Sequence, residues 1–251
     1  MSPRILVVTA VAAEADSVAD GPAVDVPLPG GFTLRRHATT PATATARTGP
    51  VVDVLVAGVG PAAAAAATAT ALAHATTHRP YGLVVSAGIA GGFQPAAPLG
   101  TVVVADAVVG ADLGAQTADG YLAVEELGFG RSVHRVPEAL TKAAADALAH
   151  GGQPHVVGTV LTVSTVTGTA ERATELAERH PGAAAEAMEG FGVAEAAAAY
   201  GLPVLEIRAV SNAVGPRDRA AWRIGEALDA LRRAFRLLTP TVFTDSEGTP
   251  Q

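Results

Sequence analysis

The sequence contains no cysteine, and this absence excludes three kinds of chemistry. A chain without thiols has no disulfide framework, no thiol nucleophile and no thiolate ligand for a metal ion. Aromatic residues are also scarce, at 4% of the 251 residues, whereas hydrophobic residues in total make up 49%. Much of the hydrophobic fraction is alanine, which favours closely packed helices over a core of large rings.

Positive charge is not in excess either. Lys and Arg number 17 against 24 Asp and Glu, which gives a formal net charge of -7. This balance provides no broad basic surface for nucleic acid or for an anionic membrane. Long apolar runs are also missing, because the helical stretch Ala62–Ala75 is only weakly apolar and Ile5–Val8 is too short for an export signal. We therefore expect a cytoplasmic protein that binds a small molecule and neither nucleic acid nor a membrane.

Hydrophobic periodicity indicates the α/β class. Short β-branched runs alternate with longer alanine-rich segments, as in proteins with a central sheet. We predict strands at Ile5–Val8, Val51–Val56, Leu83–Ser86, Thr101–Val104, Val156–Leu161 and Val204–Val210. We predict helices at Pro61–His74, Pro137–Leu148, Ala170–Arg179, Phe191–Tyr200 and Arg217–Leu238, and a further helix through Glu14 and Asp16. Loops are expected at Gly21–Gly31 and Ala111–Gly120.

No repeat or linker divides the chain, whose length suits one large α/β domain or two small ones. We expect a single catalytic domain over residues 1–240 and a frayed tail over residues 241–251. Glycine follows two predicted strands, at Ala57–Gly60 and Ala87–Gly92. Backbone without Cβ atoms would let a ligand approach there, but strand-to-helix turns also need glycine when no ligand binds.

Several familiar catalytic motifs are missing. Gly58–Pro61 lacks the third glycine of a dinucleotide fingerprint, and no glycine is followed by Lys-Ser or Lys-Thr. The seven histidines form no His-Glu-x-x-His arrangement. Ser86 and Ser164 lie near strand ends, but neither belongs to a Gly-x-Ser-x-Gly motif. We expect no metal ion, no organic cofactor and no serine hydrolase chemistry.

Two acids and one amide at strand ends carry more information. Glu14 follows the first strand, Glu189 precedes a helix and Asn212 ends the last strand. Each has a structural explanation, as a charge in a first helical turn or as a turn residue. Together they supply what cleavage of an N-glycoside by water requires. One carboxylate can activate water, the other can accept hydrogen bonds from ribose hydroxyls, and the amide can bind the leaving base.

Four segments, at Val7–Glu14, Val85–Phe93, Ala187–Ala194 and Ile207–Arg219, match the motifs of a known superfamily. On these segments the chain resembles the nucleoside phosphorylase and nucleosidase superfamily. Within it, the chain is similar to the methylthioadenosine/S-adenosylhomocysteine nucleosidases and more closely to the futalosine hydrolases. The resemblance implies a three-layer α/β/α sandwich with a central mixed, barrel-like sheet, assembled as homodimers or higher homo-oligomers.

The resemblance also implies roles for individual residues. Glu14 would activate the water and Asn212 would act on the leaving base, while Met188 and Glu189 would hold the ribose. Other residues would line or support the base site: Ile89, Ala90, Gly91, Val166 to Thr169, Phe191, Arg208 and Ser211. Two of these have equally good structural explanations, because Arg208 could form an ion pair and Phe191 could belong to the core.

Two departures from the family pattern bear on the substrate. Where adenine-releasing nucleosidases have Ser-Asp, this chain has Ser211-Asn212. An amide can donate to a 6-oxo group while its oxygen accepts from protonated N7, so Asn212 favours hypoxanthine or guanine. Futalosine carries hypoxanthine, and its hydrolysis in menaquinone biosynthesis is the predicted reaction. The second departure is Ile89, which stands where the methylthioadenosine enzymes have a serine near the water.

Alternative functions stay open. A methylthioadenosine/S-adenosylhomocysteine or aminofutalosine nucleosidase would release adenine, and a purine nucleoside phosphorylase would use phosphate in place of water. Glu14 disfavours phosphate, since the electrostatic repulsion between two anions in a partly desolvated site costs on the order of several kcal/mol. A non-catalytic purine-nucleoside binding protein would not need both Glu14 and Glu189. Arg217 and Arg219 are candidates for binding the aromatic carboxylate at the 5′ end of futalosine.

Overall fold

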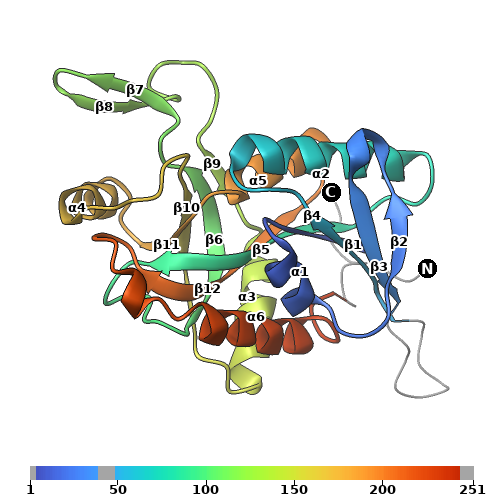
Figure 1. The fold of residues 1–251 in the computed structure, drawn as a ribbon. Helices are drawn as coiled ribbons and strands as arrows, with labels where there is room; N and C mark the ends of the chain where they lie inside the picture. The colour runs from blue at the N-terminus through green and yellow to red at the C-terminus, as the bar shows by residue number, and fades with distance from the viewer. Residues whose placement is uncertain (1–3, 39–48, 244–251) are drawn as a thin grey trace.

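A mixed β-sheet forms the centre of the molecule, with helices on both of its faces (Figure 1). The computed structural model describes residues 4–38 and 49–243. The strands are β1 (Arg4–Thr9), β2 (Val24–Pro27), β3 (Thr33–Ala38), β4 (Val51–Val56), β5 (Leu83–Gly92), β6 (Val102–Gly110), β7 (Gly114–Thr117), β8 (Gly120–Ala123), β9 (Val133–Arg135), β10 (His155–Thr162), β11 (Ala183–Ala187) and β12 (Val204–Ala213). The helices are α1 (Ala12–Val18), α2 (Pro61–Thr76), α3 (Glu138–His150), α4 (Ala170–Arg179), α5 (Gly190–Ala199) and α6 (Ile224–Leu238).

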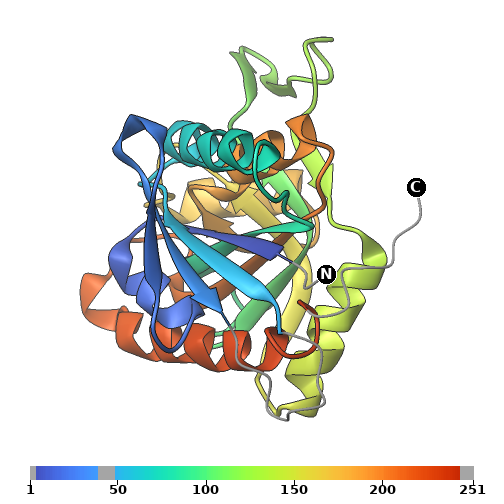
Figure 2. The ribbon, with the colours of Figure 1, turned by 90° about the vertical axis from the view of Figure 1, so that its right-hand side faces the viewer.

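Part of the sheet closes into a barrel. The strand order is β11-β10-β6-β12-β5-β1-β4-β3-β2, and β11 also pairs with β5 in antiparallel register. Strands β5, β12, β6, β10 and β11 therefore form a closed ring, and β1, β4, β3 and β2 extend it as an open sheet. Helices α2 and α5 lie on one side of the sheet and α1, α3 and α6 on the other (Figure 1 and Figure 2). The expected three-layer α/β/α sandwich with a mixed, barrel-like sheet is confirmed.

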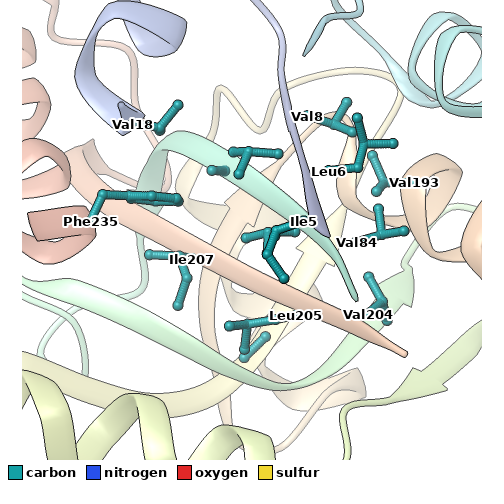
Figure 3. Close-up of a cluster of buried hydrophobic side chains, with 14 of the residues drawn as sticks. Ile5, Leu6, Val8, Val18, Val84, Val193, Val204, Leu205, Ile207 and Phe235 are labelled. Carbon is teal, nitrogen blue, oxygen red and sulfur yellow. The ribbon is translucent and has the colours of Figure 1, made fainter. Parts of the chain in front are cut away.

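Strand β1 runs through the hydrophobic core. Its segment Ile5–Val8 is completely buried, which explains why the residues are continuously apolar rather than alternating. Figure 3 shows Ile5 and Leu6 among side chains of the neighbouring strands, with Val193 of α5 and Phe235 of α6 in the same cluster. The two helices therefore seal the sheet with apolar side chains.

Helices α2 and α5 pack closely because their facing residues are small. A Cβ atom at Gly192 in α5 would overlap the backbone carbonyl oxygen of Pro61, at the start of α2. The buried positions of α2 include Ala64, Ala67 and Ala71. This is the packing that the alanine-rich composition favours, and it brings the first turns of the two helices together.

The six predicted strands are present, and the segment predicted at Val51–Val56 matches β4 residue for residue. Strands β2, β3, β7, β8, β9 and β11 were not predicted. Both loop predictions were partly wrong, since Gly21–Gly31 contains β2 and Ala111–Gly120 contains β7. Strand β11 reads Ala-Ala-Ala-Glu-Ala, a composition that favours helix, and its pairing with β10 and β5 overrides that propensity.

The predicted helices are also present, and α4 has the predicted bounds. The last helix was predicted to start at Arg217 but begins at Ile224. The intervening residues instead form a 3₁₀ turn at Arg219–Ala221, capped by the side chain of Asp218. This correction matters because it places the arginines that precede α6 in a connection rather than on a helix.

The tail predicted over residues 241–251 is packed at its start. Phe243 is fully buried and its ring lies 6.0 Å from that of Phe235 in an edge-to-face arrangement. Residues 244–251 lie outside the described residues. None of the helices in the described ranges combines the length and the apolar character needed to cross a membrane.

A buried ion cluster holds together the strands at one end of the open sheet. The carboxylate of Asp53, in β4, is fully buried and accepts hydrogen bonds from Arg4, Arg36 and Tyr81 at 2.6–3.1 Å. Burial alone would raise the pKa of Asp53, but the hydrogen bonds from Arg36, Tyr81 and Arg4 outweigh it and lower the pKa. The cluster connects β1, β3 and β4 through one charge.

Replacing Asp53 by asparagine is expected to destabilise the protein by about 3 kcal/mol, because the buried guanidinium of Arg4 loses its counter-charge. The pKa of Asp53 is lowered in the folded state, so its contribution is present above the unfolded pKa and is lost as pH falls through the folded pKa. Urea unfolding of both proteins should therefore show a large difference at neutral pH that shrinks in acid. A difference independent of pH would contradict the charge-based explanation.

Candidate active site

The site is built on two neighbouring parallel strands, β5 and β12. Their register pairs Ser86 with Glu206, Gly88 with Arg208 and Gly91 with Asn212. Side chains two residues apart in a strand point to the same face, so Glu206 and Arg208 share one face of β12. The register shifts by one residue at Ser211, and such a bulge changes the direction of the following side chain.

Glu14 lies beyond the end of β1, in the first turn of α1, and is only 4% exposed. Its Oε2 atom accepts the backbone N–H groups of Ala10 (2.9 Å) and Val11 (3.2 Å), and its Oε1 atom accepts that of Ile89 (2.9 Å). A carboxylate offers about four acceptor positions, so one position on Oε1 remains. The carboxylate is thus held by main-chain donors from the turn after β1 and from β5.

Gly88 has no side chain, so the charged groups of Glu14 and Arg208 can lie close together above its backbone. A Cβ atom there would lie 2.5 Å from Oε1 of Glu14 and 2.7 Å from Nη1 of Arg208. Real Cβ atoms do not approach other atoms so closely, so any side chain would displace one of the two groups. The second glycine cluster therefore has a packing function in the site itself.

Arg208 is the most deeply buried cation of the site, at 1% exposure. Its Nε donates to Oε1 of Glu206 (2.8 Å), its Nη2 donates to Oγ of Ser86 (3.1 Å), and its Nη1 lies 3.2 Å from Oε2 of Glu189. Burial opposes the charge, but the negative charges of Glu206, Glu189 and Glu14 outweigh it and raise the pKa of Arg208. The guanidinium therefore stays charged.

Glu189 is the N-terminal cap residue of α5 and is 6% exposed. Its Oε1 atom accepts the backbone N–H of Gly60, and its Oε2 atom faces Arg208. Gly60 has a positive φ of 97°, a conformation that glycine adopts readily, so the first glycine cluster supplies a donor to the site. Met188, just before Glu189, is half-buried.

Asn212 lies at the partly exposed end of β12. Its Oδ1 accepts from Oγ of Ser211 (2.9 Å) and its Nδ2 donates to the carbonyl of Ala213 (2.9 Å). A Cβ atom at Gly91 would lie 3.3 Å from Nδ2, and Oγ of Ser211 lies 3.2 Å from the carbonyl oxygen of Ala90. The amide keeps one N–H and one acceptor position for a further partner.

Buried and surface carboxylates anchor the loop that follows β10. The backbone N–H and hydroxyl of Thr167 donate to the two carboxylate oxygens of Glu186, and the N–H of Ser164 donates to Asp112 (2.6 Å). Burial raises the pKa of Glu186, and its hydrogen bonds to Thr167 oppose that shift. Because Glu186 pairs with Gly91 across β11 and β5, this loop is tied to the strand that faces Asn212. The side chain of Val166, in the same loop, is 38% exposed.

Phe191 packs against protein rather than standing free. The ring lies against Gly110 at the end of β6, and its centroid is 5.4 Å from that of His134. The backbone N–H of Phe191 donates to Oγ1 of Thr162. The core role is therefore observed, and a stacking role toward a base stays a prediction.

The structure brings the predicted residues together in two groups. Glu14, Arg208 and Glu189 form one group, to which Ile89 contributes its backbone N–H while its side chain packs on the core. Asn212, Ser211, Ala90 and Gly91 form the other group. No described contact ties Met188 or Val166 to either group.

Sequence reasoning missed Glu206, Ser86 and Glu186 as members of the site. For Glu206 a signal was present, because a second charge two residues before Arg208 in an apolar strand must share its face. Glu186 gave no such signal, since β11 was not predicted as a strand.

The chain is similar to proteins of known function. The family model described as the phosphorylase superfamily matches residues 4–241. A futalosine hydrolase from Streptomyces coelicolor is 60% identical over 243 residues, which cover 95% of this chain and 96% of that relative. A futalosine hydrolase from Acidothermus cellulolyticus is 48% identical over 248 residues, which cover 99% of this chain and 95% of that relative.

The fold is also found in a solved structure. The crystal structure of a 5′-methylthioadenosine/S-adenosylhomocysteine nucleosidase from Colwellia psychrerythraea, in complex with adenine, matches with a TM-score of 0.78 at 23% identity. The match covers 96% of this chain and 97% of that one, so the two share the whole fold.

Proposed function

We propose that this chain, which belongs to the phosphorylase superfamily and within it to the futalosine hydrolases, hydrolyses the N-glycosidic bond of futalosine. The products are hypoxanthine and dehypoxanthine futalosine, in menaquinone biosynthesis by the futalosine pathway. The observation that supports the site assignment is the hydrogen-bonded carboxylate of Glu14 beside Arg208 and Glu189, with the amide of Asn212 farther along β12, opposite Gly91.

Glu14 is proposed as the base that activates water. The acceptor position left on its Oε1 atom suits a water O–H, because the other positions are occupied by backbone N–H groups. As the bond between C1′ and N9 breaks, its electron pair leaves with the base, which takes up a proton from solvent at N7. The water oxygen bonds to C1′ and its proton passes to Glu14.

Glu189 is proposed to accept hydrogen bonds from the ribose hydroxyls. The sugar becomes oxocarbenium-like as the bond stretches, so a nearby carboxylate stabilises the transition state more than the ground state. The surplus of negative charge around Arg208 acts in the same direction. The same surplus disfavours a phosphate dianion, which supports hydrolysis over phosphorolysis.

Asn212 is proposed to bind the leaving hypoxanthine. Its unused N–H can donate to the 6-oxo group, and the second acceptor position of Oδ1 can accept from protonated N7. The loop from Val166 to Thr169, held by Glu186, would offer main-chain groups to the purine. Ile89, Ala90 and Gly91 would line the ribose and base.

The reaction is tested by incubating the protein with futalosine, inosine and methylthioadenosine, with and without phosphate and a chelator. Futalosine should release hypoxanthine at a rate that depends on neither addition. The Glu14→Gln variant should remain folded and bind nucleoside while kcat falls by roughly two orders of magnitude or more, because it cannot take the proton. Ribose 1-phosphate products would indicate a phosphorylase, and an unchanged kcat in the variant would remove Glu14 from the mechanism.

Base selectivity is tested at Asn212. A 6-amino base would present a donor to the donor end of the amide, a mismatch of about 1–3 kcal/mol or roughly one to two orders of magnitude in kcat/KM. Asn212→Asp should therefore reduce hydrolysis of futalosine and narrow or reverse its preference over aminofutalosine. An equal fall for both substrates would mean that Asn212 only supports the end of β12.

Arg217 and Arg219 are proposed to bind the aromatic carboxylate at the 5′ end of futalosine. Their guanidinium carbons lie 5.3 and 5.7 Å from the centre of the Trp222 ring, and Arg217 also lies against Gly168 of the loop after β10. Within the described residues neither arginine has a carboxylate partner. Two cations beside an indole ring suit an aromatic anion.

Replacing both Arg217 and Arg219 by alanine should raise KM for futalosine by roughly tenfold or more, because a charge-assisted hydrogen bond contributes about 1.5–3 kcal/mol. Inosine has no 5′ carboxylate, so its kinetics should stay unchanged and serve as the internal control. Arg223→Ala, in the same connection but paired with Glu226, is the matched control variant. Equal effects on both substrates would contradict a role in carboxylate binding.

Three broader expectations belong to the same proposal. The catalytic unit is a single domain that needs no metal ion or cofactor, it assembles as a homodimer or higher homo-oligomer, and it acts in the cytoplasm. The substrate is a small-molecule nucleoside together with water.

A further inference from the structure

Glu206 is a buried acid that the proposed reaction does not use. It is 0% exposed, near the start of β12. Its Oε1 atom accepts from Nε of Arg208 (2.8 Å) and from Oγ of Ser86 (3.4 Å). Its Oε2 atom is buried and has no hydrogen-bond partner among the described residues. Placing a carboxyl group there is costly, so its presence calls for a physical explanation.

The surrounding backbone is shaped to admit this carboxyl group. A Cβ atom at Gly190, the first residue of α5, would overlap both oxygens of Glu206. Glu206 therefore lies between Arg208 and the start of the helix that carries Glu189. Burial raises the pKa of Glu206, and the neighbouring Arg208 opposes that shift.

The orientation of Arg208 depends on this acceptor. The guanidinium is planar, so fixing Nε at Glu206 and Nη2 at Ser86 determines where Nη1 points. Nη1 faces Oε2 of Glu189 and lies over Gly88, beside Glu14. If the Nε partner were lost, the guanidinium could rotate, and Nη1 would no longer be held in this position relative to Glu189 and Glu14.

We propose that Glu206, assisted by Ser86, is a positioning residue that orients Arg208 and so sets the placement of Glu189 and Glu14. This inference rests on the proposed hydrolysis of the nucleoside. In this proposal Glu206 acts only through Arg208, with which it forms its shortest hydrogen bond. Its effect therefore falls on the transition state more than on substrate binding.

The test measures futalosine hydrolysis by Glu206→Leu, Glu206→Gln and Ser86→Ala, each checked for folding by circular dichroism. In Glu206→Leu, kcat should fall about 10- to 100-fold with KM changed less than about threefold, since a small displacement of a catalytic group has such an effect. Glu206→Gln keeps an acceptor for Nε and should recover most of the rate. Ser86→Ala should lower kcat by less than Glu206→Leu does.

A double-mutant cycle separates positioning from simple structural support. In an Arg208→Gln background, Glu206→Leu should cause no further loss of kcat, because the group through which it acts is gone. Asp53→Asn is the matched control, since it also removes a fully buried carboxylate from an arginine Nε but lies outside the site. It should lower stability and leave kcat of the folded enzyme unchanged.

Two outcomes would overturn the inference: a normal kcat in folded Glu206→Leu, or the same fractional loss in the presence and absence of the Arg208 guanidinium. If a folded Glu206→Leu variant is too unstable to assay, the same cycle run with Ser86→Ala decides the question. A wild-type protein that releases no base from futalosine would instead refute the proposed function, so the two failures are distinguishable.

Discussion

The burial of the Arg208 charge is the constraint on which the rest of the site depends. A guanidinium at 1% exposure is tolerable only if carboxylates and hydrogen-bond acceptors replace its water shell. Here two carboxylates from separate elements pair with it, Glu189 from the cap of α5 and Glu206 from β12 itself, and Glu14 in the first turn of α1 adds a third negative charge nearby. The negative charges that surround Arg208 therefore fix where the first turns of α1 and α5 lie against the sheet.

Glycine residues, which have no side chain, make this concentration of charge possible. Gly88 leaves room for Glu14 and Arg208, and Gly190 leaves room for Glu206. Gly60, in its positive-φ conformation, gives a backbone N–H to Glu189. Glycines near strand ends can be ordinary turn residues. These three instead make room for carboxylates or donate a hydrogen bond to one.

The sequence predicted the parts of the molecule that depend on local pattern. Glu14 and Asn212 were placed at strand ends from the apolar runs that precede them. Both lie beside the glycine-rich strand β5, because Glu14 accepts from Ile89 and the register of β12 places Asn212 opposite Gly91. Closure of the barrel was inaccessible to local pattern, because it depends on β11, an alanine strand whose pairing with β5 overrides its helical propensity. The anchoring of Thr167 by Glu186 was missed for the same reason. Arg208 had two explanations, a structural ion pair or a site residue; its contacts show the ion pairs, and its role in the site stays a proposal.

In the proposed mechanism, different parts of β12 serve the charge at the sugar and the selectivity for the base. Around Arg208 three carboxylates face one cation, and this surplus of negative charge suits a sugar that becomes cationic and repels an anionic nucleophile. Asn212 lies past the irregularity at Ser211, where the strand becomes partly exposed, and it makes no described contact with any of these carboxylates. If Asn212 binds the base as proposed, a change of this amide alters which purine is accepted and leaves the charges around Arg208 as they are. The proposed choice of water over phosphate and the proposed choice of purine therefore depend on different residues, which lie on the two sides of the bulge at Ser211.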